Sequence, residues 1–572
     1  MKKFIIGLLT GIILTGLAGI IFVFSLIRFG ERRPSVADGS TLVLQLDGEV
    51  PEKAPVDSPF PFIGNPTPVT VHELWACLNK ASADSRIKAV LLLADRADVG
   101  WAKLQQIRQD LVNFRKSGKP LVAFLRSPGT REYYLATAAD RIYMAPEDFL
   151  DLKGLRAELS FYKKTLDKVG VEVEIEHIGR YKDAGDMFTE TGMSPETREV
   201  INTVLDSFYD HLIETIASGR KRKPGEIRAI LDEGPFTGSQ AHAHGLVDAL
   251  RFEDQVFGEL KDRLKQGEIK KLAHRDYLRA VGTADRDARK RIAWIVGEGA
   301  IVRGSGQDSM GSDEGFSSGA FIRMVRRVAN DRDIQGVILR VDSPGGDALA
   351  SDEMLREIKL LRDKKPMVIS MSDAAASGGY YVSMTGDPIV AYQNTITGSI
   401  GIIYGKLNLR GLYDKLGVQK EILIRGRNAA IDTSYGPMTP AARAKLRSSL
   451  EEFYKQFVGK AVASRKKKYE EMEPLAQGRV WLGWQAREQG LIDEVGGIDR
   501  AVEMIKKKAN IAAGEKVRLV PYPPKRSFWE QYLRLTSDST VESKLKQLLG
   551  PDYRLWIDGG IMRLMPFRID IK

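Results

Sequence analysis

The two halves of this 572-residue chain repeat each other, and no other feature constrains its fold as strongly. The stretch "MSPETREVINTVLDSFYDHL" has its counterpart in "MTPAARAKLRSSLEEFYKQF", at an offset of about 245 residues. Three pairs of segments align in this way: 85–100 with 332–347, 192–223 with 437–468, and 234–250 with 478–496. A repeat this long is a whole domain, not the unit of roughly 20 to 50 residues found in solenoids. The chain is therefore a tandem duplication.

Each copy alternates short apolar runs with amphipathic stretches. In the second copy, "GVILRVD" and "MVISMSD" are rich in aliphatic residues and bounded by turn residues, which predicts strands. Between them, "EMLREIKLLRDKK" carries apolar residues at helical spacing. A strand, a helix and a second strand in that order indicate a parallel sheet covered by helices. The fold class is thus α/β in both copies.

The copies differ at the positions where chemistry is expected. "VDSPGGD" and "AAASGGYY" occur only in the second copy, so that Ser377 stands opposite Thr130 of the first copy. The reverse holds for Lys182, in "HIGRYKDAGDMF", because the matching stretch "IRGRNAAIDTSY" places Ala429 or a neighbour there. One copy retains a serine with glycines and the other a lysine, which suggests one site assembled from both.

A serine hydroxyl becomes a good nucleophile only when a base removes its proton. All six histidines precede residue 275, so a Ser–His pair would have to form across the two copies, and this alternative stays open. Lysine can serve instead if burial lowers its pKa from the usual value of about 10.4. Ser399, in "TITGSIG", is a candidate to orient such an amine.

The glycines next to Ser377 match the same chemistry. The residue after a nucleophile commonly donates its backbone N–H to the oxyanion of a tetrahedral intermediate, and here that residue is Gly378. A second donor is expected from the turn that contains Gly345 and Gly346. Three alanines before Ser377 leave room for an extended peptide.

Residues 4–27 carry no charge, and 24 apolar residues are enough to cross a bilayer, which takes about 20. We expect an uncleaved anchor, whose orientation the flanking charges leave undecided. The single cysteine, Cys77, excludes an internal disulfide and a cysteine-rich zinc site, and we expect no metal and no cofactor. The net charge of +11 is spread along the chain without a nucleic-acid motif, so no nucleic-acid partner is expected.

The segments "VDSPGGD", "AASGGYY", "TGSIG" and "YKDAGDMF" together resemble the signal peptide peptidase A (protease IV) family, in its long, duplicated, membrane-anchored bacterial form. The resemblance covers the chain to about residue 510. It implies a Ser–Lys dyad, with Ser377 as nucleophile and Lys182 as general base, an acyl-enzyme intermediate, an oxyanion hole of Gly346 and Gly378, and Ser399 holding the lysine.

The same resemblance implies a fold of two ClpP/crotonase-like domains, built as spirals of ββα units, behind the transmembrane helix. It implies a homotetramer that cleaves signal-peptide remnants and other apolar peptides. It also places the enzyme in the bacterial cytoplasmic (inner) membrane as a single-pass protein, with its catalytic domain on the outer, periplasmic side. The expected domains are an anchor (1–28), a linker (29–41), the repeat with the lysine (42–285), the repeat with the serine (286–510) and an extension of unknown role (511–572).

Two functions of other classes compete with a protease. A crotonase-type enzyme for acyl thioesters would share the fold and the oxyanion glycines, but it needs carboxylates where this chain has a serine and a lysine. A non-catalytic membrane scaffold would have no reason to retain the complementary "ASGG" and "YKDA" segments.

Overall fold

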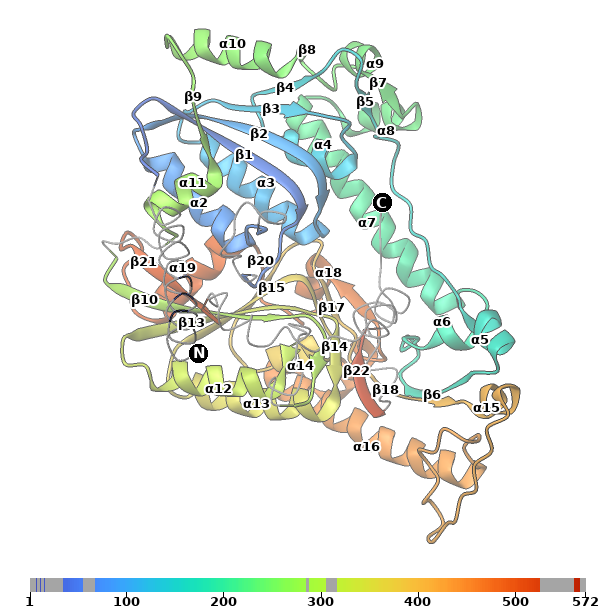
Figure 1. Cartoon of the computed structure of the whole chain (residues 1–572). Coiled ribbons are helices and arrows are strands. Elements are labelled where there is room, and N and C mark those ends of the chain that lie inside the picture. Colours follow the sequence, from blue (N-terminus) through green and yellow to red (C-terminus); the bar gives the residue numbers. More distant parts are fainter. Residues whose placement is uncertain are drawn as a thin grey trace.

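The computed structural model describes residues 34–54, 67–283, 288–304, 316–524 and 560–565, together with Gly7, Gly11 and Thr15. The first repeat forms a parallel sheet with the strand order β8-β4-β3-β2-β1-β9 (Figure 1). Its strands are β1 (Ser40–Glu49), β2 (Ile87–Asp98), β3 (Leu121–Leu125), β4 (Arg141–Met144), β8 (Ala249–Leu250) and β9 (Lys270–Ala273). A separate two-stranded ribbon joins β5 (Phe149–Leu150) to β7 (Phe236–Thr237).

The second repeat builds the same sheet. Its strands run in the order β20-β16-β15-β13-β10-β21, which matches the first sheet strand for strand, with β17 and β19 added beside β15. The strands are β10 (Lys290–Glu298), β13 (Ile334–Ser343), β15 (Met367–Ala376), β16 (Ile389–Ala391), β17 (Ile396–Gly398), β19 (Val480–Leu482), β20 (Glu494–Val495) and β21 (Val517–Tyr522). The predicted α/β class and tandem duplication are confirmed.

A third sheet joins the two repeats and also takes in the end of the chain. Its order is β12-β11-β14-β22-β18-β6. The strands are β6 (Glu172–Ile178), β11 (Ile301–Val302), β12 (Phe316–Ser317), β14 (Gly345–Asp347), β18 (Ile402–Asn408) and β22 (Gly560–Leu564). Since β6 belongs to the first repeat and β18 to the second, this sheet brings residues of the two repeats side by side.

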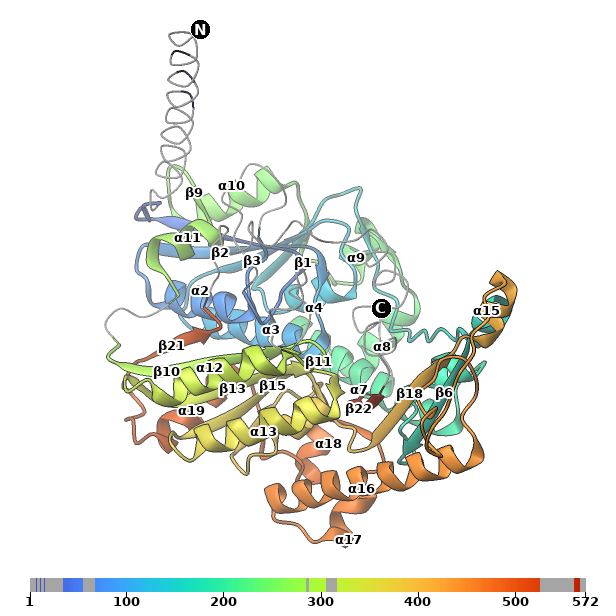
Figure 2. The ribbon, with the colours of Figure 1, turned by 60° about the horizontal axis from the view of Figure 1, so that its bottom comes forward.

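The two main sheets share one hydrophobic core. Ile338 and Val368 of the second sheet belong to the same buried cluster as Leu104 and Leu42 of the first repeat. Helices α2, α3 and α19 lie between the sheets, while α10 covers the outer face of the first sheet and α12 and α13 that of the second (Figures 1 and 2). These helices are α2 (Val71–Ala83), α3 (Trp101–Arg115), α10 (Glu253–Leu264), α12 (Ser318–Asn330), α13 (Ala348–Arg362) and α19 (Ile498–Lys508).

The duplication is also visible in matching helices. The long helices α7 (Pro195–Arg220) and α16 (Pro440–Arg465) each begin with a proline after a capping Ser194 or Thr439, whose hydroxyl accepts a backbone N–H of the first turn. The other helices are α4 (Thr130–Ala136), α5 (Lys163–Val169), α6 (Asp186–Thr189), α8 (Pro224–Asp232), α9 (Gly238–Ala243), α11 (His274–Val281), α14 (Gly378–Ser383), α15 (Arg410–Leu416), α17 (Tyr469–Met472) and α18 (Gly483–Glu488).

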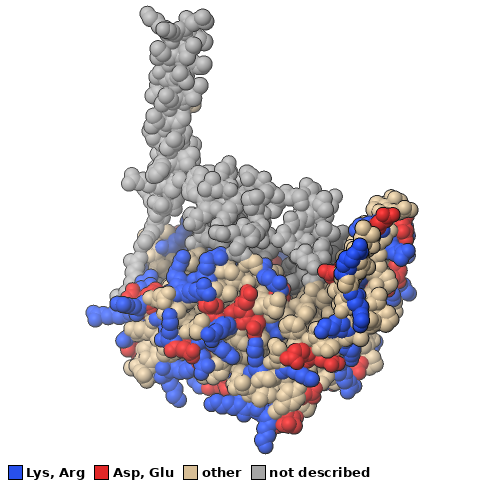
Figure 3. Space-filling view, turned by 90° about the horizontal axis from the view of Figure 1, so that it is seen from below, with Lys and Arg blue, Asp and Glu red and all other residues tan. Residues whose placement is uncertain are grey.

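The predicted anchor, residues 1–28, lies outside the described residues apart from Gly7, Gly11 and Thr15. Among the residues that are described, no helix has the length and hydrophobicity of a membrane span. On the face shown in Figure 3, basic and acidic side chains are interspersed, in agreement with the scattered charges of the sequence. The segment set apart as an extension, 511–572, contributes β21 and β22 to the sheets.

Candidate active site

Ser377 stands at a sharp turn between β15 and α14. Strand β15 ends at Ala376 and α14 begins at Gly378, so Ser377 alone makes the change of direction. Its φ of 54° and ψ of −110° lie in a region that non-glycine residues rarely adopt, at a cost of about 1–3 kcal/mol. The backbone N–H of Ser377 donates to the carbonyl of Gly398 at 2.8 Å, and the side chain is fully buried. Neighbouring structure therefore holds this serine in a strained position.

Strand pairing brings Lys182 to this turn from the other repeat. Strands β6 and β18 are antiparallel, with Ile178 opposite Ile402 (Figures 1 and 2 show them side by side). In an antiparallel pair, the residues that follow one strand lie beside those that precede the other. The segment that leads from β6 to Lys182 thus lies beside Ser399, which comes just before β18.

The Lys182 amine makes three polar contacts. Its Nζ lies 2.8 Å from Ser377 Oγ, 2.8 Å from Ser399 Oγ and 2.9 Å from the Ser399 carbonyl oxygen. All three side chains are fully buried. A neutral amine has two N–H groups and one lone pair, so it can donate to both Ser399 oxygens and accept the Ser377 proton. The structure thus places the Lys182 amine within hydrogen-bond distance of both Ser377 and Ser399.

Burial lowers the pKa of Lys182 well below its usual value, because an ammonium loses its hydration there. The negative charge of Asp183 opposes this effect, and the positive charge of Arg563 adds to it. The Asp183 carboxylate accepts hydrogen bonds from the hydroxyls of Thr197 and Ser194. The site therefore favours the neutral amine that a general base requires.

The predicted glycines lie at the same place. A Cβ atom built on Gly345 would lie 2.7 Å from the backbone nitrogen of Gly378, so the Pro-Gly-Gly turn is packed against the start of α14. The N–H groups of the first turn of a helix have no partner within the helix, which leaves that of Gly378 able to bind a carbonyl oxygen. The structure thus gathers Ser377, Lys182, Ser399, Gly346 and Gly378.

Gly346 tolerates no side chain. Its φ is 152°, and a Cβ atom there would lie 2.1 Å from the carbonyl oxygen of Ile301. We expect Gly346→Ala to lower the free energy of unfolding by at least about 1–3 kcal/mol, because the backbone must shift. Urea unfolding measures this, with Gly192→Ala as the control, since nothing lies within 4 Å of a Cβ on Gly192. Equal losses in the two variants would contradict the steric argument.

The first repeat has a glutamate, Glu132, at the position where the second repeat has Gly379. Glu132, which stands opposite Gly379, accepts hydrogen bonds from the backbone N–H groups of Ala97 (2.5 Å) and Gly129 (2.8 Å). The flanking tyrosines keep matching contacts: Tyr133 donates to the Leu246 carbonyl and Tyr380 to the Leu491 carbonyl. The duplicated frame survives, but in the first repeat Glu132 caps the start of α4, at the position where the second repeat has Gly379. The sequence alignment showed Glu132 opposite a glycine, yet not what the carboxylate binds.

No described histidine shares a hydrogen bond with Ser377. His211 forms hydrogen bonds with the side chains of Gln105 and Tyr134, and the His177 ring forms one with the Gly179 carbonyl. The Ser–His alternative left open by the sequence therefore has no support in the described part of the chain.

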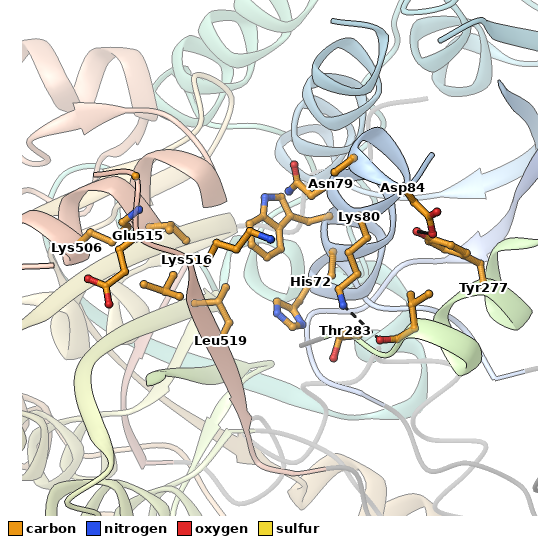
Figure 4. A pocket seen from close by; sticks show the side chains of 17 residues that line it. His72, Asn79, Lys80, Asp84, Tyr277, Thr283, Lys506, Glu515, Lys516 and Leu519 are labelled. Atoms are coloured by element: carbon orange, nitrogen blue, oxygen red, sulfur yellow. Dashed lines mark hydrogen bonds between the residues drawn. The ribbon is translucent and has the colours of Figure 1, made fainter. Parts of the chain in front are cut away.

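A pocket of about 560 Å³ lies elsewhere, where α2 and α11 of the first repeat meet β21 (Figure 4). Its walls include His72, Lys80, Tyr277, Lys506 and Leu519. None of the five predicted site residues lines this pocket.

Comparison with known proteins agrees with the duplicated design. Peptidase family S49 matches the chain twice, over residues 113–267 and 359–512. The serine protease SPPA, chloroplastic, of Arabidopsis thaliana is 36% identical over 491 residues, which cover 85% of this chain and 71% of that protein. Protease 4 of Salmonella typhi is 30% identical over 448 residues, with coverages of 76% and 71%. Protease 4 of Haemophilus influenzae is 28% identical over 521 residues, with coverages of 86% and 82%.

Proposed function

This chain belongs to peptidase family S49 and is a serine protease, and from that premise we propose that it cuts peptides with a Ser377–Lys182 dyad. The observation that carries the proposal is the contact of 2.8 Å between Lys182 Nζ and Ser377 Oγ. It joins two buried groups, one from each repeat, at places where the repeats retain complementary chemistry.

The mechanism follows from the contacts. Neutral Lys182 takes the proton of Ser377 as Oγ attacks the carbonyl carbon of the substrate, and backbone N–H groups of Gly346 and Gly378 stabilise the resulting oxyanion. Lys182 then gives the proton to the departing amine, which leaves an acyl-enzyme. A water molecule, deprotonated by Lys182, hydrolyses the ester and restores Ser377. Ser399 keeps the amine aimed at Oγ throughout.

The rival functions lack such support. An acyl-thioester enzyme of the crotonase type would need a carboxylate where Ser377 pairs with a lysine. A scaffold without activity would not need a buried lysine that lacks a charged hydrogen-bond partner, because such a group destabilises the fold. The three hydrogen bonds of Lys182 go to neutral oxygens.

We propose that the enzyme is a single-pass protein of the bacterial cytoplasmic membrane with its catalytic domain on the outer side. The uncharged segment 4–27 supports an anchor of this kind. Cleaved signal peptides and other apolar peptides are the proposed substrates. An enzyme anchored next to the bilayer would meet them where they are released, and the resemblance to signal peptide peptidase A supports the same assignment.

A homotetramer is proposed on the basis of an exposed apolar segment. Around α15, the side chains of Leu416, Ile422, Leu423 and Ile424 are exposed by 44–89%. By the repeat offset this segment corresponds to β6 of the first repeat, which pairs along its edge with β18 of the second repeat. The same pairing between neighbouring copies would cover it, and a head-to-tail contact of this kind can close into a ring.

The pH dependence of Ser377 reactivity tests the proposed function. Lys182 must be neutral to act as a base, and its pKa is lowered. We therefore expect the rate of Ser377 labelling by a fluorophosphonate to rise with pH through the pKa of Lys182, and to be lost on acidification below it. Mass spectrometry of the labelled peptide measures this. Labelling at another residue, or a rate that does not change with pH, would contradict the dyad.

The lowered pKa of Lys182 also makes the stability of the fold depend on pH, in a direction that can be stated. Because the folded-state pKa of Lys182 lies below its unfolded value, the unfolded chain binds more protons between the two. The penalty of burying Lys182 is thus fully present below the folded pKa and disappears as the pH rises toward the unfolded one. Replacing this lysine with methionine should stabilise the protein at neutral pH.

A further inference from the structure

The residue that follows the proposed general base, Asp183, carries a buried carboxylate that the mechanism does not use. It is 8% exposed, and its Oδ2 accepts hydrogen bonds from the hydroxyls of Thr197 and Ser194 at the start of α7. Its other oxygen, Oδ1, is buried without a hydrogen-bond partner among the described residues. A buried charge that is only partly satisfied destabilises a fold, so its presence next to the base calls for a reason.

The carboxylate and the lysine are present in one repeat and missing from the other. The segment "GRYKDAGD" of the first repeat aligns with "GRNAAIDT" of the second, so that Lys182 stands opposite Ala429 and Asp183 opposite Ala430. A carboxylate needed only for the shared frame would be expected in both repeats. Its restriction to the repeat that supplies the lysine links Asp183 to the base.

The hydroxyl that binds Asp183 follows the same pattern. Both long helices keep their capping residue, Ser194 in α7 and Thr439 in α16, whose hydroxyl accepts a backbone N–H. Three residues later, α7 has Thr197 and α16 has Ala442. Helix α16 thus begins without a hydroxyl at this position. Thr197 is therefore not needed to start the helix, and in the structure its hydroxyl donates to Asp183.

The Lys182 amine lies under the influence of one charge of each sign. Its aliphatic part is enclosed by glycines: a Cβ atom on Gly401 would lie 3.0 Å from Lys182 Cδ, and one on Gly478 2.7 Å from Lys182 Cβ. The positive charge of Arg563, on β22, disfavours the ammonium, whereas the negative charge of Asp183 favours it. Because its hydrogen bonds tie Asp183 to α7, this negative charge is fixed in place.

Other titratable groups near Asp183 act on the carboxylates of this region. They are His177, Asp186 and Glu190, and the surface ion pairs of Glu196 with Arg180 and of Glu199 with Arg479. Burial, with the charges of Asp183 and Glu190, raises the pKa of Asp186 to about 7. Burial also raises the pKa of Asp183, while its hydrogen bonds with α7 and the charge of His177 lower it. Of these groups, Asp183 is the one whose charge acts on the Lys182 amine.

We propose that Asp183, held by Thr197, is a positioning residue for the general base: it fixes the loop of Lys182 at the start of α7, and its charge sets the lowest pH at which the enzyme works. This inference rests on the proposed function. A negative charge near an amine favours the protonated form. Without Asp183 the amine would stay neutral to lower pH, but it would be a weaker base. The carboxylate therefore lowers activity at acidic pH and raises it at higher pH.

The pH profile of Ser377 labelling tests the role of this charge. Asp183→Asn keeps the size of the side chain and an oxygen that can accept from Thr197, and it removes the charge. The rate of labelling by a fluorophosphonate is measured by mass spectrometry for the full chain in detergent micelles, over the pH range in which the chain stays folded. We expect the acidic limb to move down by about one pH unit, so that the variant reacts about tenfold faster at acidic pH and more slowly at high pH. Asp206→Asn, at an exposed position of α7, should leave the profile unchanged.

A second set of variants tests the hydrogen bond and keeps the inference falsifiable if Asp183→Asn fails to fold. Thr197→Val removes the hydroxyl but keeps the charge of Asp183, and it should lower the labelling rate at least about tenfold at every pH, because the base is no longer held in place. Thr197→Ser should restore the rate to within about threefold. Thr203→Val is the matched control, since the Thr203 hydroxyl donates to the Glu199 carbonyl of its own helix.

Either of two results would overturn the inference. One is an acidic limb of Asp183→Asn that coincides with that of the unmodified chain or lies at higher pH. The other is a Thr197→Val variant that is labelled as fast as Thr203→Val. Failure of the proposed function would be seen separately, as an absence of Ser377 labelling in the unmodified chain at any pH.

Discussion

Replacing Ser377 with alanine is expected to lower kcat/KM for a fluorogenic apolar peptide by at least about 10⁴-fold, and replacing Lys182 with alanine to lower it to a similar extent. The two groups act as one unit through their contact of 2.8 Å, so the double variant should be no worse than either single variant. Initial rates at several substrate concentrations measure the effect.

The controls separate chemistry from folding. Ser383 is also buried, and its hydroxyl donates a hydrogen bond to the Gly379 carbonyl within α14. Ser383→Ala therefore tests the loss of a serine hydroxyl that lies near Ser377. We expect it to retain activity within about tenfold, because the cost of one hydrogen bond is about 1 kcal/mol. If Lys182→Ala kept full activity while Ser377→Ala lost it, the base would lie elsewhere. If neither substitution mattered, the proposed dyad would be wrong.

Replacing Arg340 with methionine is expected to lower the free energy of unfolding by about 3–5 kcal/mol. Arg340 and Glu52 form an ion pair with an N–O distance of 2.6 Å, and both side chains are 0% exposed. Arg340 also donates to Ser370, Ser372 and the Met371 carbonyl. Its loss would leave the Glu52 carboxylate buried without its countercharge at the boundary between the repeats.

The pKa of Glu52 supports this expectation. Burial raises this pKa, but the charge and hydrogen bond of Arg340, together with the charge of Lys103 and the hydrogen bond of Ser372, lower it overall. Urea unfolding of the single variant and of the double variant Arg340→Met/Glu52→Met tests the argument, since the double change leaves no unpaired charge and should recover much of the loss. Arg326→Met serves as control, because Arg326 pairs with Glu357 at the surface and should cost about 1 kcal/mol or less. If Arg326→Met lowered the free energy of unfolding as much as Arg340→Met, burial of the ion pair would not explain the effect.

The duplication and the α/β class could be read from the chain because both depend on local patterns. Apolar runs bounded by turn residues predicted the region of β13 and β15, and the helical spacing between them predicted α13. The matching order of the six shared strands in the two main sheets then follows, since two copies of one pattern bury the same faces.

The candidate residues could also be chosen without coordinates. Comparison of the two copies isolated Ser377, Lys182 and the glycines, because an uneven loss between equivalent positions is visible in a sequence. The strain at Ser377 was not foreseen. Its positive φ follows from the way Gly398 and the start of α14 hold the turn.

The C-terminal segment marks the limit of reading a sequence alone. Residues 552–567 contain aromatic and aliphatic side chains without a recognisable motif, and they received no role. Only the pairing with β14 and β18 shows that Arg563 lies against Gly345 and Tyr381. Such contacts join residues about 200 positions apart, and local patterns carry no information about them.

The sequence by itself determined that this protein is a duplicated α/β chain, and it singled out one serine, one lysine and two glycine-containing turns as candidates for its chemistry. Local hydrophobic periodicity and the comparison of two copies were sufficient for that. The tertiary structure decided that Lys182 and Ser377 touch, that Glu132 caps α4 where the second repeat has Gly379, and that β22 pairs with β14 and β18. The physical reason is that strand register, not sequence spacing, sets which distant side chains share one buried space.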